Sequence, residues 1–218
     1  MLLQKIAPSA QKLLEKYLRA DQKFAKVFRL VKIDFVSSNL TAHNWEHIYR
    51  DCINAIIIGE AEKADMRIVL PAIVMHDIGF LYGADGKTHG AIGADKLPTY
   101  LKKIKVAYPK KSVAHMADCI RTHKGSMHNE KPATLEAKVV ADADLIEKFG
   151  PIGVYQYIRT FTEFNRGIES IIKRKDEIKW LKLETRTGRK IAEKGREFVI
   201  LFFKQLDKSY NPYRSNFV

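Results

Sequence analysis

Cysteine is scarce in this chain, because only Cys52 and Cys119 occur among its 218 residues. Two cysteines are too few to build the disulfide framework that stabilises many secreted domains, so that class of protein is excluded. Both lie in amphipathic stretches, and we expect both to be small buried side chains. Charged residues are spread through positions 1–24, unlike in a signal peptide, so we expect no cleaved leader.

Long apolar runs are also lacking. A membrane-spanning helix needs about 20 consecutive apolar residues, and no stretch of this chain approaches that length. We therefore expect a cytoplasmic protein with no membrane partner. With 46% hydrophobic and 29% charged residues, the chain has the composition of an ordinary globular protein that buries a sizeable core.

Alternation of apolar and polar residues, which marks a half-buried strand, is missing. Apolar residues instead return at steps of three and four, as in "HNWEHIYRDCINAIIIGEAEK" and "TLEAKVVADADLIEKFG". We find neither internal repeats nor a linker. The pattern predicts an all-α fold, a single-domain bundle of about eight to ten helices over residues 1–218. Pro71 falls inside one predicted helix, where it either occupies the first turn or bends the helix.

Acidic residues are outnumbered by basic ones. The 38 Lys and Arg against 25 Asp and Glu give a formal charge of +13 and a pI of about 9.6, which favours anionic partners. The stretch 102–111 holds five lysines and no acid. A second cluster, in 173–196, contains Lys173, Arg174, Lys175, Lys179, Lys182, Arg186, Arg189, Lys190, Lys194 and Arg196. Such clusters can steer a polyanion, but a solvated helix surface is the simpler explanation.

Several polar side chains interrupt otherwise apolar helices. His43 and His47 lie four residues apart and so face the same side of one predicted helix. In "LPAIVMHDIGF", an apolar run ends with His76 and Asp77. Neighbours in a regular helix point about 100° apart, but both side chains can converge on one point if the last turn unwinds.

Two more carboxylates, Asp142 and Asp144, lie in the apolar stretch "VVADADLIEKFG" and need a partner there. A divalent metal is the economical partner, because imidazole nitrogen and ionised carboxylate suit Mn, Fe, Ni, Co, Zn or Mg. Two histidines and two carboxylates leave positions open for water and a substrate oxygen, which favours hydrolysis. From spacing alone, each histidine also remains a candidate structural side chain.

A histidine, then a His-Asp doublet, then a distant aspartate, each on its own helix, resembles the HD-domain superfamily of metal-dependent phosphohydrolases. The stretches that carry the resemblance are "AHNWEHIYR", "AIVMHDIG", "IRTHKG" and "PATLEAKVVADADLIEKFGPIGVYQYIR". The sequence is most similar to small stand-alone bacterial HD hydrolases. The resemblance covers residues 25–165, so residues 166–218 form a basic helical C-terminal extension beyond the expected HD core.

The resemblance implies roles for particular residues. Four side chains are expected to bind one divalent metal: His47, His76, Asp77 and Asp142. Asp77 is also the candidate that orients or deprotonates the attacking water. His89 and His123 match positions where related proteins keep further histidines lining the pocket. They are candidates to hold a substrate phosphate, to protonate the leaving oxygen or to complete a second metal site.

Arg50 and Lys87 are further candidate substrate contacts, because positive charge stabilises the anion that forms during phosphoryl transfer. The predicted function is hydrolysis of a phosphomonoester or phosphodiester in a small phosphorylated substrate, preferably a nucleotide. Two alternatives stay open: an inactive HD fold that senses nucleotides, and a basic helical protein that binds nucleic acid, the less favoured partner. Self-association as a homo-oligomer is also left open.

The chain departs from better-known relatives directly after the His-Asp doublet. Ile78, Gly79 and Phe80 follow it, so the Gly-Tyr-Pro signature of cyclic-dinucleotide phosphodiesterases is missing. The acidic residue that the 5′-nucleotidase branch uses there is missing as well. The substrates of those branches therefore do not transfer to this chain.

Overall fold

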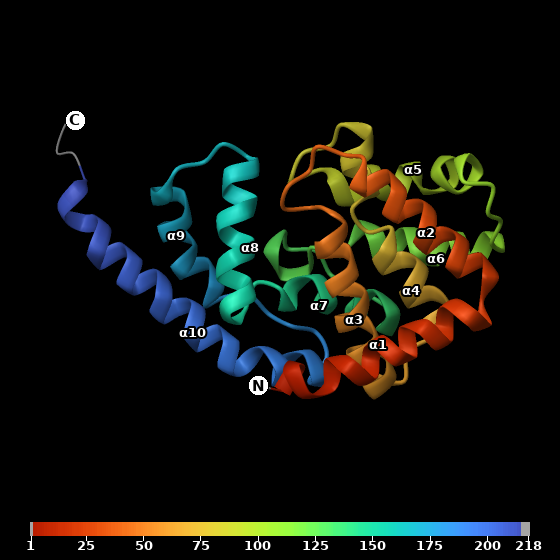
Figure 1. The fold of residues 1–218 in the computed structure, drawn as a ribbon, viewed down its shortest axis with the longest axis horizontal. Coiled ribbons are helices and arrows are strands. Elements are labelled where there is room, and N and C mark those ends of the chain that lie inside the picture. Colours follow the sequence, from red (N-terminus) through yellow and green to blue (C-terminus); the bar gives the residue numbers. More distant parts are fainter. Residues whose placement is uncertain (1, 215–218) are drawn as a thin grey trace.

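The structure, a computed structural model, describes residues 2–214, with the side chains of residues 7–174 and 176–214. Within that part of the chain it contains ten α-helices and no strand, which confirms the predicted all-α fold (Figure 1). Met1, residues 215–218 and the side chain of Lys175, all part of the predicted domain, lie outside the described residues. No helix in the described range is both long enough and apolar enough to cross a membrane.

The elements follow one another along the chain with short connections. The α-helices are α1 (Leu2–Ala20), α2 (Gln22–Val36), α3 (Trp45–Glu62), α4 (Met66–Val74), α5 (His89–Lys103), α6 (Lys110–Arg121), α7 (Leu135–Ile146), α8 (Gly150–Glu163), α9 (Ile168–Ile178) and α10 (Arg186–Tyr210). Three short 3-10 helices are η1 (Ile78–Tyr82), η2 (Gly125–Met127) and η3 (Asn211–Tyr213).

Short polar side chains fix where several helices start. Asp21, Asn44, Asp65, Thr134 and Thr185 accept hydrogen bonds from backbone N–H groups in the first turns of α2, α3, α4, α7 and α10. Each such cap satisfies donors that the helix itself leaves unpaired and contributes about 1 kcal/mol. The caps therefore set the positions at which the polar residues of α3 and α7 enter the core.

The core lies where α3, α4, α6 and α7 pack together. Ile56, Val69 and Val140 are fully buried there, and each such side chain contributes about 1.5–3 kcal/mol. Cys52 and Cys119 are free and fully buried, as expected. Because α3, α4 and α7 pack against one another here, a polar residue on their facing sides lies inside the protein.

Helix α4 ends just before the His-Asp doublet. Its last residue is Val74, and Met75 is its C-cap. Pro71 lies in the second turn of this helix, not in the first. Beyond the cap the backbone leaves the α-helix and enters η1, and the side chains of His76 and Asp77 are both fully buried. The predicted unwinding at this helix end is confirmed.

Helices α8, α9 and α10 gather beside this bundle, at the left of Figure 1. Helix α10 packs against α8 and α9, and also against α7 and α3. Several cations of the predicted basic cluster have structural partners here. Arg189 and Arg196 donate hydrogen bonds to backbone carbonyls within residues 178–184, and Lys179 pairs with Asp176. Arg189 and Arg196 therefore help to hold the extension together, whereas Lys179 lies on its exposed surface.

Candidate metal centre

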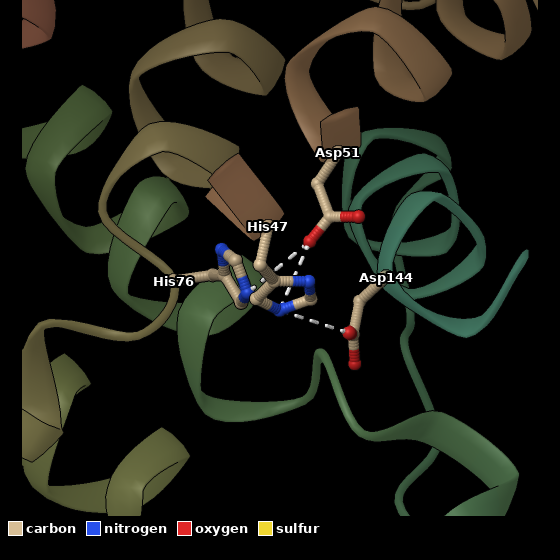
Figure 2. A group of neighbouring side chains, drawn as sticks. All are labelled: His47, Asp51, His76 and Asp144. Carbon is tan, nitrogen blue, oxygen red and sulfur yellow. Dashed lines mark ion pairs between the residues drawn. The ribbon is translucent and has the colours of Figure 1, made fainter. Parts of the chain in front are cut away.

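Five buried polar side chains meet between α3, α7 and the end of α4. His47 and Asp51 come from α3, one turn apart, and Asp144 comes from α7. His76 and Asp77 follow α4. Figure 2 shows four of the five pointing toward one another. Each is at most 1% exposed, so bulk water does not solvate them.

The atoms are spaced like ligands around a shared cation. His47 Nε2 lies 3.3 Å from Asp51 Oδ2 and 3.5 Å from Asp144 Oδ1. Asp77 Oδ2 lies 3.4 Å from the Nε2 atoms of both His47 and His76. These separations exceed the usual N–H···O hydrogen bond of about 2.9 Å. They match the roughly 3.0–3.5 Å between neighbouring ligands whose bonds to a metal are about 2.1 Å long.

The same atoms have no protein partner. Both carboxylate oxygens of Asp51 and Asp77, together with Asp144 Oδ1 and His76 Nε2, are buried without a hydrogen bond in the described part of the chain. A buried polar group left unpaired costs about 1–3 kcal/mol, and a charged one costs more. Burial raises the pKa of the Asp51 carboxyl well above its ordinary value, although the neighbouring His47 opposes this. A divalent cation would satisfy all of these groups together, so the residues fit such a metal.

The histidine rings are oriented so that Nε2 faces the cluster. His76 and His123 each donate from Nδ1 to the carbonyl oxygen three residues earlier, at 2.6 Å. His47 donates from Nδ1 to the Glu147 carboxylate at 2.8 Å. Because these acceptors cannot donate, Nδ1 carries a proton, and Nε2 is the nitrogen of each ring left to bind a metal. Metal-binding histidines use this arrangement, in which an outer group fixes the ring.

Two further histidines, His89 and His123, face the other oxygen of Asp77. Their Nε2 atoms are 3.1 Å apart and lie 3.4 and 3.7 Å from Asp77 Oδ1. Burial lowers the pKa of His89 well below its ordinary value, and burial together with the neighbouring His76 lowers that of His123 to about 3. Both rings are therefore neutral near pH 7. His76, Asp77 and His123 form a second group with the spacing to hold a cation.

Two buried lysines bring positive charge to the cluster, and sequence reasoning missed both. Lys124 Nζ lies 3.3 Å from Asp144 Oδ2, and Lys148 also lies close to this carboxylate. Burial alone would raise the pKa of Asp144, but the two lysines hold it well below its ordinary value. Asp144 therefore stays ionised, which is the form that binds a metal.

The structure does not bring Asp142 into the cluster. Its carboxylate accepts hydrogen bonds of 2.6–2.8 Å from the backbone N–H groups of Glu184 and Thr185 and from the Thr185 hydroxyl. A step of two residues turns a helical side chain by about 200°, so Asp142 and Asp144 face nearly opposite sides of α7. Asp144 thus occupies the position that the sequence analysis expected for Asp142.

Other expected site residues divide between the centre and its surroundings. Arg50 forms a two-pronged ion pair with Glu147 and so supports the group that holds His47. Lys87 lines the pocket described below. Asp51 was missed, although its position one helical turn after His47 is a signal that could have found it.

A pocket of about 500 Å³ opens beside the cluster. His43, Lys124 and Lys148 are among the residues that line it, and Lys124 contacts Asp144. A larger hollow of about 700 Å³ lies between α5 and α6. No residue of the cluster lines either pocket, but Lys124 links the smaller one to the cluster. We therefore take the smaller pocket as the approach to the candidate metal centre.

His43 is held at this pocket by Glu163 of α8. His43 Nδ1 lies 2.5 Å from Glu163 Oε1, and Glu163 Oε2 accepts hydrogen bonds of 2.6 Å from the N–H groups of Thr41 and Ala42. Burial alone would raise the pKa of Glu163, but His43 and these N–H groups lower it to about 2. Glu163 therefore ties α8 to the segment that precedes α3.

Glu163→Gln is expected to be less stable than the unmodified protein at neutral pH. The pKa of Glu163 falls from 4.5 to about 2 on folding, so its ionised form stabilises the fold above pH 4.5. That contribution is lost as the pH falls toward about 2. Allowing for screening, we expect a difference of about 1–2 kcal/mol at pH 7 in denaturant unfolding. The difference should shrink near pH 3.5, and a constant difference between the two pH values would contradict this account.

The described part of the protein is all-helical and contains a buried His/Asp cluster with the spacing to hold a metal ion. Residues 44–148 match the family model of the HD domain. The chain is similar to the uncharacterised protein YpgQ of Bacillus subtilis strain 168, with 25% identity over 183 residues, which are 77% of this chain and 84% of YpgQ.

Solved structures show the same fold. The crystal structure of Bacillus subtilis YpgQ in complex with ADP has a TM-score of 0.60 at 23% identity, covering 85% of this chain and 97% of YpgQ. A predicted HD-superfamily hydrolase from an uncultured Thermotogales bacterium has a TM-score of 0.56 at 24% identity, covering 85% and 92%. A protein from Lactobacillus plantarum has a TM-score of 0.71 at 16% identity, covering 88% and 98%. An HD fold with such a centre supports metal-dependent phosphohydrolase chemistry in general.

Proposed function

We propose that this protein is a divalent-metal-dependent phosphohydrolase that cleaves a phosphoester bond in a nucleotide. The observation that carries the proposal is the set of buried, partnerless atoms spaced like metal ligands. The proposed ligands are His47, Asp51, His76, Asp77 and Asp144. Asp144 replaces Asp142 in this proposal, because the Asp142 carboxylate is already bound to the segment before α10.

A divalent metal bound here would activate a water molecule and polarise the phosphoryl group under attack. Asp77 is the proposed residue that orients this water. Burial alone would raise the pKa of Asp77, but the neighbouring imidazoles of His76 and His47 hold it well below its ordinary value. A carboxylate with a low pKa stays ionised near neutral pH, so it can accept a hydrogen bond from the water and orient it. His89 and His123 are the proposed groups that complete a second cation site or protonate the leaving oxygen.

Three lysines favour a phosphorylated substrate. Lys87, Lys124 and Lys148 line the pocket, and the last two are nearly buried. Positive charge in a partly dry site stabilises the anion that accumulates during phosphoryl transfer. The crystal structure of the relative YpgQ with ADP makes a nucleotide our preferred substrate class.

The experiment is a screen of nucleotides and other phosphoesters with Mn, Mg, Ni and Co added in turn, measured as phosphate release. We expect metal-dependent turnover that EDTA removes. Turnover that is unchanged after exhaustive chelation would contradict the proposal. Nucleotide binding without turnover of any compound would favour a sensing module instead.

Lys124→Met is expected to lower kcat/KM for the best substrate by about 10–100-fold, because the pocket loses a buried cation next to the candidate metal ligand Asp144. Its matched control is Lys63→Met, a lysine at the exposed C-cap of α3 that does not line the pocket. Steady-state kinetics of both variants provide the measurement. Equal kcat/KM values for the two variants would remove Lys124 from the proposed substrate contacts.

A further inference from the structure

One wall of the pocket is built by residues beyond the HD-domain match. That match ends at residue 148, whereas Phe161 lies on α8, Phe164 is the C-cap of α8, and Arg174 lies on α9. The same pocket is lined by the buried lysines Lys124 and Lys148, next to the candidate metal ligands. The pocket therefore combines buried cations with aromatic side chains.

A guanidinium group and a phenyl ring are stacked in this wall. The Arg174 guanidinium lies 5.2 Å from the centroid of the Phe161 ring. Glu177 forms an ion pair with Arg174 and restricts its guanidinium, and all three residues line the pocket. A planar cation held on an aromatic ring gives a flat surface on which another ring can stack.

Phe164 adds a second ring from the same wall. Its ring centroid lies 5.7 Å from that of His43, and Gly86 packs against it. A Cβ atom at Gly86 would lie 3.1 Å from Phe164 Cζ, so a larger residue there would displace the ring. Phe164 is 37% exposed, which leaves part of the ring free to contact a ligand.

Thr160 supplies an unsatisfied polar group to this wall. Its Oγ1 atom is buried and forms no hydrogen bond with any residue that the structure describes, and the residue lines the pocket. A buried hydroxyl without a partner costs about 1–3 kcal/mol. A ligand with polar atoms at the edge of a flat ring would satisfy this hydroxyl while stacking on the neighbouring side chains.

We propose, on the basis of the proposed function, that this wall binds the aromatic base of a nucleotide substrate. Lys124 and Lys148, which line the same pocket, bind its phosphates. Phe164 and Arg174, the latter held on Phe161, stack on the base, and Thr160 forms a hydrogen bond with its edge. Stacking on aromatic and guanidinium planes accepts any base, so the wall selects nucleotides over phosphate compounds without a ring.

The test compares equilibrium binding of ADP and of pyrophosphate, measured by titration calorimetry in the same Mn²⁺ buffer. The variants are Phe164→Ala and the nearly isosteric Thr160→Val. The matched control is Phe198→Ala, a 44% exposed phenylalanine on α10 that does not line the pocket. We expect Phe164→Ala to weaken ADP binding about tenfold and Thr160→Val about fivefold. Pyrophosphate affinity should change less than about twofold in both, and Phe198→Ala should change neither affinity.

Equal losses for ADP and pyrophosphate would overturn the proposal, as would a wild-type protein that binds pyrophosphate as tightly as ADP. Circular dichroism of each variant confirms that the fold is retained. Preference for ADP without hydrolysis of any nucleotide would remove the proposed hydrolysis and support the base-binding wall. Hydrolysis of phosphoesters with no preference for ADP over pyrophosphate would overturn the wall and leave the hydrolysis.

Discussion

His76→Ala is expected to lose divalent metal from the core cluster and to hydrolyse its substrate at least about 1,000-fold more slowly. His76 belongs to both groups of side chains with metal-ligand spacing, so its removal leaves neither group intact. The measurements are elemental analysis of protein purified without chelator and phosphate release by the same protein. Undiminished metal content in the variant would contradict the proposed centre.

A matched pair on α7 controls this experiment. Asp144→Asn should behave like His76→Ala, whereas Asp142→Asn should keep the metal, because only Asp144 faces the cluster. Binding of a metal to the folded state raises the unfolding temperature. Added Mn²⁺ should therefore stabilise the unmodified protein and Asp142→Asn, but not Asp144→Asn. The opposite ranking of the two variants would restore Asp142 as the ligand.

Glu147→Gln is expected to weaken metal affinity about 10–100-fold without removing a ligand. The Glu147 carboxylate accepts the Nδ1 proton of His47 and is itself held by Arg50. An amide can present its N–H₂ group to Nδ1 and so favour the tautomer with the proton on Nε2, which cannot bind a metal. Competition with a metal-chelating dye gives the affinity.

Arg50→Gln tests the charge of Arg50 separately from the Glu147 carboxylate that orients His47. It leaves the carboxylate on His47 Nδ1 and removes only the outer cation, so we expect a smaller loss of affinity than for Glu147→Gln. Both variants should be less stable, because each leaves a buried polar group without its partner. Wild-type metal affinity in Glu147→Gln would show that His47 is oriented by other contacts.

Helical periodicity was sufficient to predict the fold, because each helix of this bundle repeats apolar residues at its own period. It also located the end of α4, where the polar pair His76–Asp77 follows an unbroken apolar run and the structure shows the helix ending. The HD-domain match over 44–148 lies within the region where the sequence resembled that family.

The choice between Asp142 and Asp144 lay beyond the sequence pattern. Residues from Val139 to Ile146 on α7 are all buried, so the apolar spacing does not indicate which side faces the cluster. The partners of Asp142 come from residues 184–185, and only the folded chain brings them to α7. Lys124 was missed for a similar reason, since a lysine after a histidine in a short loop gives no signal of burial.

The carboxylates of Asp142 and Asp144 on α7 also join regions of the protein that a domain diagram would separate. One faces inward to the candidate centre, and the other anchors the start of α10 through three hydrogen bonds. Deleting the carboxyl-terminal helices would remove none of the proposed ligands. It would, however, remove the hydrogen-bond donors of Asp142 and so loosen α7, the helix that positions Asp144. A shortened protein should therefore have an impaired centre, although its sequence still contains every proposed ligand.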